Sequence, residues 1–404
     1  MTTSRKILIL TADAGFGHRA AANAVAGALA MRYPDTSETV IVNPLEDKRA
    51  PAVLRRAQAD YDRMIQSSPE LYKFGYEASD ASFPVSIAEQ GLIAMLYVTM
   101  RDVVQAHQPD AIVTTYPLYQ APLAALFALN REYIPVLTVV TDLISVHGLW
   151  FNDDVDLCLV PTEPVRQKAL ESGLPSERVE VTGLPVDPVF GQPVDKVTLR
   201  REHGWSTDRI VVLFAGSKRV KKLEPVAHIL NPSGVPLELA IITGGDDELR
   251  ARLAQVEWHL PAHVYGYVNN MPAFLRAADF IVCKAGGLIV SEALAAGLPL
   301  LLAEAIPGQE TGNAQFVEEG GAGVLVDGPV AALEMVFHWL MDGHALLRQR
   351  AENACRLGRP HAAERVAELA MTAAAEGAQR RVRRLGSQTS LLNRLLAGLD
   401  LSRG

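Results

Sequence analysis

One local pattern recurs along the chain and restricts the fold more than any other feature. A short run of β-branched residues and leucines is followed by glycine, and then by apolar residues three and four positions apart. The first copy has the run 6–11 (KILILT), a glycine loop at 13–18, and apolar residues at Ala22, Val25, Ala26 and Leu29. A continuous apolar strand is typical of a parallel sheet covered on both faces, and the later spacing indicates a helix. The pattern therefore predicts an α/β fold built from doubly wound parallel sheets.

The pattern occurs in two series. Strand-like runs of the first series, after its first copy, lie at 111–114, 136–140, 157–160 and 179–182, with a helix predicted over 163–172. Those of the second series lie at 210–214, 239–242, 280–283 and 300–302. Between the series, prolines and mixed charge at 188–205 favour a linker.

The length of 404 residues is large for a single core. We predict an N-terminal domain at 1–195, a C-terminal domain at 196–375 and a helical tail at 376–404. In parallel sheets of this type, ligands bind at the carboxyl ends of the strands. We therefore expect both sheets to present those ends to one interdomain cleft.

Composition argues against several classes of protein. The net charge of -8 gives little electrostatic support to nucleic-acid binding. The three cysteines are widely separated and indicate small buried side chains in a reducing compartment. The acidic pairs at 153–154 and 246–247 have no further ligand at suitable spacing, so we predict no metal and no other cofactor.

We predict a cytoplasmic protein that contacts membranes only peripherally, on the cytoplasmic face. The first apolar run meets Asp13 too early for a secretory signal, and no uncharged apolar stretch approaches the roughly 20 residues that cross a bilayer. Residues 91–98 either belong to the core or cover a lipid groove. The basic residues at 380–384 and the leucines at 391–396 either lie on anionic lipid or pack back across the first domain.

The segment 284–313 (KAGGLIVSEALAAGLPLLLAEAIPGQETGN) has the most specific pattern in the chain. A strand leads to Gly286 and Gly287, where a helix is predicted to begin. Free N–H groups at a helix start bind a diphosphate, and glycines leave room for its close approach. Glu292, one turn later, is suited to accept hydrogen bonds from ribose hydroxyls. The polar residues that follow the next strand suit recognition of sugar hydroxyls: Gln309, Glu310 and Asn313.

Several further motifs accompany this segment in a fixed order. They are the glycine loop ending in Gly17-His18, the tyrosine-rich 61–76 (YDRMIQSSPELYKFGY), Thr141-Asp142 with His147 and Trp150-Phe151, Gly183-Leu184-Pro185-Val186, and Gly266-Tyr267-Val268 with Met271. Together they resemble monogalactosyldiacylglycerol synthases and bacterial diacylglycerol glucosyltransferases. These families are similar in turn to the N-acetylglucosaminyltransferase that makes the peptidoglycan lipid precursor. The resemblance covers roughly residues 5–375 and implies the type-B glycosyltransferase (GT-B) fold.

The resemblance implies that the first domain binds the acceptor and faces the membrane. His18 is the expected general base, and an imidazole with an unperturbed pKa near 6.5 suits that role. Asp142 either orients a histidine or acts as the base itself. The residues expected at the acceptor are Gly15, Gly17, Tyr116 and His147, although His147 could instead contact the donor.

The resemblance assigns the second domain to the UDP-sugar donor. Its expected donor-binding residues are Gly216, Ser217, Gly244, Gly266, Tyr267, Val268, Met271, Lys284, Gly286, Gly287, Glu292, Gln309, Glu310 and Asn313. The chain departs from the family at Asp187, where arginine is common, and at Tyr116, where histidine is common. The loop from Gly216 to Arg219 also lacks the usual glycine cluster, so Ser217, Lys218 or Arg219 would reach the diphosphate.

The reaction implied is a single inverting transfer of galactose or glucose from a UDP-sugar to the hydroxyl of diacylglycerol or a similar lipid, giving a β-glycoside. Expected partners are the UDP-hexose, the lipid acceptor and an anionic membrane surface, with no nucleic acid; the oligomeric state stays open. Two alternatives share the fold: a UDP-sugar 2-epimerase, or transfer to another acceptor. A non-catalytic sugar-nucleotide-binding protein is a third.

Overall fold

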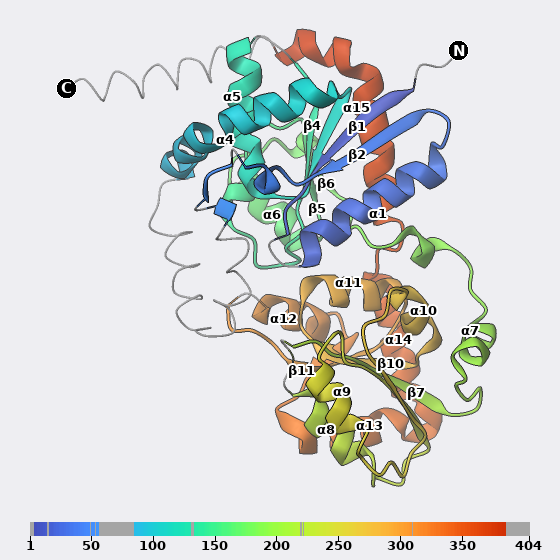
Figure 1. Cartoon of the computed structure of the whole chain (residues 1–404). Helices are drawn as coiled ribbons and strands as arrows, with labels where there is room; N and C mark the ends of the chain where they lie inside the picture. Colours follow the sequence, from blue (N-terminus) through green and yellow to red (C-terminus); the bar gives the residue numbers. More distant parts are fainter. Residues whose placement is uncertain are drawn as a thin grey trace. The chain divides into compact units, whose positions relative to one another are not determined.

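A computed structural model of the chain describes residues 4–13, 16–48, 50–52, 54–55, 85–130, 133–218, 220, 222–308 and 310–384. The chain divides into two compact units: residues 1–185 with 362–404, and residues 186–361. Each unit has its own parallel sheet with helices packed against it (Figure 1). Residues 61–76 and the leucines at 391–396, which were used above as motifs, lie outside the described part.

The described residues of the first unit form a six-stranded sheet in the order β2-β1-β3-β4-β5-β6, with all neighbours parallel. Its strands are β1 Arg5–Leu10, β2 Ser37–Val42, β3 Ala111–Thr114, β4 Val136–Val139, β5 Leu157–Val160 and β6 Val179–Val181. Its helices are α1 Phe16–Arg32, α4 Val85–His107, α5 Gln120–Asn130, α6 Glu163–Glu171 and α15 Ala362–Arg384. Short 3-10 turns are η1 Pro44–Glu46, η2 Pro117–Tyr119, η3 Gly148–Trp150 and η4 Ser176–Arg178.

Alternate residues of β1 explain why this sheet is covered on both faces. Ile7 and Ile9 pack with apolar residues of α1 and α15. Leu8 and Leu10 point to the other face and pack with residues of α4, α5 and α6. All four β1 side chains are fully buried, which is the pattern expected of a strand within a doubly wound sheet.

The described residues of the second unit form another six-stranded parallel sheet, in the order β12-β11-β10-β7-β8-β9. Its strands are β7 Ile210–Ala215, β8 Leu237–Ile242, β9 Ala262–Tyr265, β10 Phe280–Lys284, β11 Leu300–Glu304 and β12 Gly323–Leu325. Its helices are α7 Lys196–His203, α8 Leu223–Leu230, α9 Asp247–Leu253, α10 Met271–Ala277, α11 Gly287–Ala295, α12 Thr311–Glu319, α13 Gly328–Leu340 and α14 Ala345–Leu357. The 3-10 turns are η5 Pro188–Gly191 and η6 Asp342–His344.

Each sheet has one point where the strand order reverses, and this point is where such folds bind ligands. In the first unit the reversal lies between β1 and β3, and in the second between β7 and β10. The residues that follow these strands include His18, in the first turn of α1, and Tyr116 in one unit, and Gly216 and Gly286 in the other. The topology therefore brings residues from distant motifs together within each unit.

Several details differ from the sequence predictions. Cys158 and Cys283 are buried as expected, but Cys355 is exposed because it lies on an outward-facing position of α14. Residues 188–205 are not a plain linker, because they contain η5 and α7. Asp195 begins α7 by accepting a hydrogen bond from Val197, Gly204 ends it at φ 71°, and Arg200 pairs with Asp279. The short strands β2, β9 and β12 were also not predicted. Most of their side chains are only half-buried, so these strands lack the continuous apolar run that marks the others.

Helix α15 packs on the first unit. Its buried residues include Val366, Ala367 and Ala370, which join Ile7 and Ile9 in one core cluster. The described side chains of this helix therefore pack across the first sheet, but the two alternatives for 380–396 concern side chains outside the described part. The side chains of 380–384 lie outside the described part. No helix in the described residues is both long and apolar enough to span a membrane.

Candidate functional site

His18 lies in the first turn of α1, directly after the glycine loop that follows β1. Two threonines from neighbouring strand ends hold its ring. Its Nδ1 lies 2.8 Å from the carbonyl oxygen of Thr115 and 2.7 Å from the Thr141 hydroxyl. A carbonyl can only accept, so Nδ1 carries the proton and both oxygens share it. Nε2 then holds the lone pair, and no described residue forms a hydrogen bond with it.

Burial of the His18 ring lowers its pKa from 6.5 to about 4, and the hydrogen bond to the Thr115 carbonyl partly opposes this shift. Tyr116 meets the ring edge-on with centroids 5.0 Å apart, and Trp150 lies at 6.1 Å. A ring with this pKa is neutral across physiological pH. The site therefore presents an unprotonated imidazole nitrogen, which is the form that a general base requires.

Asp142 follows β4 and is held by Trp150, whose indole N–H donates to its Oδ2 at 2.7 Å. Burial raises the pKa of Asp142 to about 6, while the Trp150 hydrogen bond and Lys168 oppose the shift. The hydrogen bonds to the His18 ring thus involve Thr115 and Thr141, and the carboxylate of Asp142 binds Trp150 instead. Asp142 is a second base candidate close to the same aromatic side chain.

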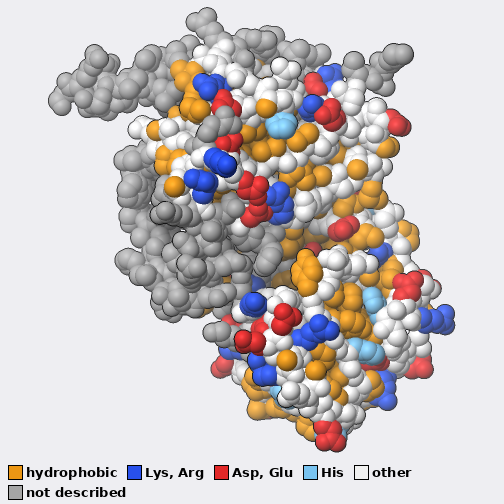
Figure 2. All heavy atoms as spheres, in the orientation of Figure 1, with side chains coloured by type: hydrophobic (Ala, Val, Ile, Leu, Met, Phe, Trp, Pro, Cys, Tyr) orange, Lys and Arg blue, Asp and Glu red, His pale blue; other side chains and the backbone are white. Residues whose placement is uncertain are grey.

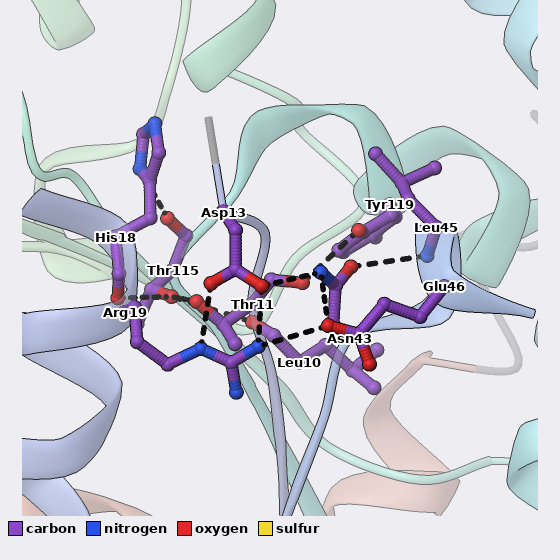
Figure 3. Close-up of polar contacts among 10 residues, drawn as sticks. All are labelled: Leu10, Thr11, Asp13, His18, Arg19, Asn43, Leu45, Glu46, Thr115 and Tyr119. Atoms are coloured by element: carbon purple, nitrogen blue, oxygen red, sulfur yellow. Dashed lines mark hydrogen bonds and ion pairs between the residues drawn. The ribbon is translucent and has the colours of Figure 1, made fainter. Parts of the chain in front are cut away.

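A clasp of charged and amide side chains closes the glycine loop that carries His18 (Figure 3). Arg19 donates from Nε and Nη2 to both carboxylate oxygens of Asp13, at 2.8 and 2.9 Å. Asn43 donates to Asp13 at 3.0 Å, and Glu46 lies 3.7 Å from the Arg19 guanidinium. The hydrogen bond from Arg19 lowers the pKa of Asp13, so the pair stays ionised. The clasp joins both ends of the loop.

Thr115 also binds the backbone of His18. Its hydroxyl lies 3.0 Å from the His18 carbonyl oxygen and 3.0 Å from the Thr11 hydroxyl (Figure 3). The Tyr119 hydroxyl donates to the Thr11 carbonyl at 3.1 Å. Backbone and ring of His18 are therefore fixed to the same strand end, which limits the positions that Nε2 can take.

Three further residues were expected at the acceptor: Gly17, His147 and Gly15. A Cβ placed on Gly17 would meet no described atom within 4 Å, so space beside the loop is open at this position. His147 caps η3, with its Nδ1 accepting from the Leu149 N–H at 3.1 Å. Gly15 lies outside the described residues.

In the second unit, the ends of β7 and β8 approach each other backbone to backbone. A Cβ on Gly216 would lie 2.7 Å from the Ile242 carbonyl oxygen, and one on Gly244 would collide with the Gly216 carbonyl. Gly244 also has φ 59°, which favours glycine. Close backbone packing therefore explains why both positions are glycine, in addition to the predicted donor role. Ser217 follows Gly216 in the same loop, and Arg219 lies outside the described residues.

Helix α11 begins at the carboxyl end of β10, as the sequence predicted, with Gly286 at its N-cap and Gly287 as its first residue. Lys284 forms an ion pair with Glu310, which is only 5% exposed. The other Glu310 oxygen accepts from the Ile306 N–H at 3.1 Å. A cation and a carboxylate thus lie beside the free N–H groups of the helix.

Asn313 was expected in a loop, but it lies in the first turn of α12 and is 4% exposed. Its Nδ2 donates to the Ala285 carbonyl at 2.9 Å, directly before Gly286. Its Oδ1 is buried without a hydrogen-bond partner among the described residues. Gln309 lies outside the described part of the chain.

Glu292, on the second turn of α11, has a pKa raised to about 7 by burial and by the charge of Asp187. Asp187 caps η5 by accepting from the Val189 N–H at 2.9 Å. The carboxylate at position 187 therefore acts on Glu292. The loop after β9 is largely exposed, with Tyr267 at 74%, beside Gly266, Val268 and the α10 start at Met271.

Sequence reasoning missed Thr115, Arg19 and Asp13 as parts of the site. The strand-end position of Thr115 and the six-residue spacing of Asp13 and Arg19 across a glycine loop were the available signals. No group of three or more His, Cys, Asp or Glu side chains suited to a metal occurs in the described residues.

Comparison with known proteins assigns the family. The profile described as monogalactosyldiacylglycerol (MGDG) synthase matches residues 18–186, and that of the glycosyltransferase family 28 C-terminal domain matches 210–365. The probable monogalactosyldiacylglycerol synthase of Glycine max is 33% identical over 372 residues, covering 89% of this chain and 69% of the soybean protein. This chain belongs to the monogalactosyldiacylglycerol synthase family. It is therefore a glycosyltransferase, as the resemblance implied.

The fold of this MGDG synthase family member also agrees with solved structures. MurG of Acinetobacter baumannii matches with a TM-score of 0.58 and 18% identity, covering 91% of this chain and 99% of MurG. The UDP-GlcNAc 2-epimerase of Neisseria meningitidis matches with a TM-score of 0.56 and 16% identity, covering 90% and 98%. These likenesses, with the two parallel sheets, establish the predicted GT-B fold. They do not separate transfer from epimerisation.

Proposed function

We propose that this enzyme transfers galactose or glucose from a UDP-sugar to the hydroxyl of diacylglycerol or a similar lipid, with inversion to a β-glycoside. The family supports this reaction, because the soybean relative is named for the synthesis of monogalactosyldiacylglycerol. The observation that carries the proposal is the His18 site, where Thr115 and Thr141 hold one ring nitrogen and leave the other unbonded by described residues.

The proton of the acceptor hydroxyl goes to Nε2 of His18 in this proposal. Thr115 and Thr141 fix the tautomer through Nδ1, so Nε2 keeps its lone pair and direction. The acceptor oxygen then forms its bond to the anomeric carbon as the bond to UDP breaks. Asp142 is the other candidate for this role, since its raised pKa of about 6 makes it the stronger base of the two.

The departing UDP takes up negative charge, and the second unit would stabilise it. The N–H groups at the start of α11 and the ammonium of Lys284 supply fixed positive charge at Gly286. Glu292 on the same helix would accept hydrogen bonds from the ribose. The residues themselves would perform these roles, and no metal is part of the proposal.

We further propose that the enzyme acts peripherally at an anionic membrane surface, on its cytoplasmic face. Leu92, Leu96 and Met100 bury one side of α4, while Met95 and Val98 are 38% and 49% exposed on the other. Figure 2 has apolar side chains at the surface over α4, among charged ones. Helix α4 packs against η2 and η3, which adjoin Tyr116 and His147. An exposed apolar surface on the unit that carries His18 suits a lipid acceptor.

The experiment that tests the proposal incubates the full chain with radiolabelled UDP-galactose or UDP-glucose and liposomes of diacylglycerol with anionic phospholipid. We expect a β-linked glycolipid, identified by chromatography and mass spectrometry. Conversion of either donor to free hexose and UDP with every lipid tried would contradict transfer to lipid. Formation of an epimerised UDP-sugar without lipid would support the epimerase alternative.

A further inference from the structure

The ion pair of Lys284 and Glu310 lies at the point where β10 passes into α11. Lys284 is the last residue of β10, and its side chain is 20% exposed. Glu310 is bound on both carboxylate oxygens, by Lys284 on one and by the Ile306 N–H on the other. This pair is therefore buried and has definite geometry, in contrast to the mobile ion pairs typical of protein surfaces.

Both charges lie directly over the start of the helix. A Cβ added to Gly286 would be 3.2 Å from Lys284 Cε and 3.4 Å from Glu310 Oε1. The start of an α-helix attracts negative charge, and Lys284 adds a full positive charge there. A carboxylate from the chain itself thus occupies the electropositive position that suits a phosphate.

An independent feature at the same place indicates a ligand. Asn313 donates its Nδ2 to the Ala285 carbonyl, one residue before Gly286. Its Oδ1 is buried and has no partner among the described residues. Buried polar atoms are normally satisfied, so an acceptor without a donor beside a helix start favours a bound molecule that carries hydroxyl or N–H groups.

We infer that Glu310 is an internal counter-ion of Lys284, and that the diphosphate of the donor displaces it. This inference rests on the proposed donor site in the second unit. Displacement transfers the Lys284 ammonium from carboxylate to phosphate and leaves Glu310 without its cation. A hydroxyl of the donor hexose can then donate to the freed carboxylate, whereas UDP lacks the hexose.

This exchange makes the affinity for UDP and for UDP-sugar unequal. UDP must break a buried ion pair and leaves one carboxylate poorly compensated, which is costly in a protein interior. A UDP-sugar recovers part of that cost through its hydroxyls. Glu310 would therefore weaken the binding of the product UDP and help it leave.

The test measures UDP binding by isothermal titration calorimetry with the full chain. We expect Lys284→Met to bind UDP about tenfold more weakly, because a charge-assisted hydrogen bond is lost. Glu310→Gln should bind UDP about tenfold more tightly than the wild type, because no carboxylate competes for Lys284. The double variant should match Lys284→Met, since Glu310 acts through the lysine.

The control is Glu318→Gln, which removes the same charge from the other end of α12, where Glu318 accepts from the Leu325 N–H. It should bind UDP as the wild type does. Circular dichroism and thermal melting check that each variant folds. Should Glu310→Gln not fold, Glu310→Asp carries the test, because its shorter side chain weakens the pair and should also tighten UDP binding.

The outcomes separate the two proposals. If Lys284→Met weakens UDP binding but neither Glu310 variant tightens it, the displacement is wrong and the donor site stands. If the wild type binds no UDP, the proposed function fails with it. If both Glu310 variants tighten binding equally in the presence and absence of Lys284, the carboxylate acts by general charge alone and the inference is overturned.

Discussion

The two points where the strand order reverses differ in their electrostatics. At the first, a carbonyl and a hydroxyl hold His18, and the nearby charges of Asp13 and Arg19 neutralise each other. At the second, Lys284 and Glu310 place full charges at the helix start itself. The same topology therefore supports two kinds of site, and the side chains after each strand decide which.

The difference suits the role proposed for each site. A base must stay unprotonated, and burial without a neighbouring carboxylate contact lowers the pKa of His18 to about 4. A diphosphate is an anion, so its site needs positive charge in place before it arrives. Such a site is costly when empty unless a counter-ion occupies it, and Glu310 supplies one.

The largest effect is expected when the first site loses its base. His18→Ala should lower turnover by about 10²-fold or more while UDP affinity stays nearly unchanged, because the imidazole acts on the acceptor proton. Steady-state kinetics and calorimetry measure the two quantities. His107→Ala, at the end of α4, is the matched control and should keep full turnover. An equal loss of UDP affinity in His18→Ala would instead assign His18 to the donor.

The pH profile decides between His18 and Asp142. A base must be deprotonated, so kcat at saturating donor falls as pH falls through its pKa, whereas the titration of Glu292 acts on donor affinity. With His18, whose pKa is about 4, activity should persist to pH about 5. With Asp142, whose pKa is about 6, activity at pH about 5 should already be down about tenfold. Circular dichroism over the same range shows whether the fold persists. An acid limb near 6 in the wild type, with turnover lost in Asp142→Asn and retained in His18→Ala, would remove His18 as the base.

The clasp around the glycine loop should have a moderate effect. Arg19→Met removes both hydrogen bonds to Asp13 and loosens the turn that carries His18, so we expect kcat to fall about tenfold. UDP affinity should not change, because the second unit is untouched. Arg166→Met, which breaks an exposed pair with Glu163 in the same unit, is the control. Unchanged kcat in Arg19→Met would mean that Thr115 and Thr141 alone position the ring.

The fold and the general location of both sites follow from local patterns. The run at 6–11 and the apolar helix positions after it are determined by neighbouring residues, so β1 and α1 were predictable. Gly286 and Gly287 could be placed at a helix start for the same reason.

The partners within each site could not be predicted in this way. Thr115 reaches His18 across 97 positions of sequence, and Glu310 reaches Lys284 across 26. Such contacts depend on strand order, which a single sequence does not encode locally. Helix α7 was not predicted because exposed charged residues are as typical of a linker as of a helix. Nothing in the local sequence indicates that Arg200 binds Asp279.

The smallest expected effect concerns the charge of Asp187, which acts on Glu292 in the second unit. Asp187→Asn should lower the pKa of Glu292, because the charge of Asp187 helps to raise it to about 7. An ionised Glu292 accepts from ribose hydroxyls, so UDP affinity should fall as pH falls through about 7, and the midpoint should lie lower in the variant. At pH about 6 the variant should bind UDP about threefold more tightly. Asparagine keeps the cap on η5, so the fold should persist.

Calorimetry between pH 5.5 and 8, as an approximate range that spans the titration, measures both midpoints. The phosphates of UDP titrate equally with both proteins, so the difference between the two curves reports on Glu292. Asp195→Asn removes another capping carboxylate of the second unit and should leave the midpoint where it is in the wild type. Identical midpoints for Asp187→Asn and the wild type would mean that Glu292 does not contact the ribose. The electrostatics of the second site would then depend on the Lys284 pair and the helix start.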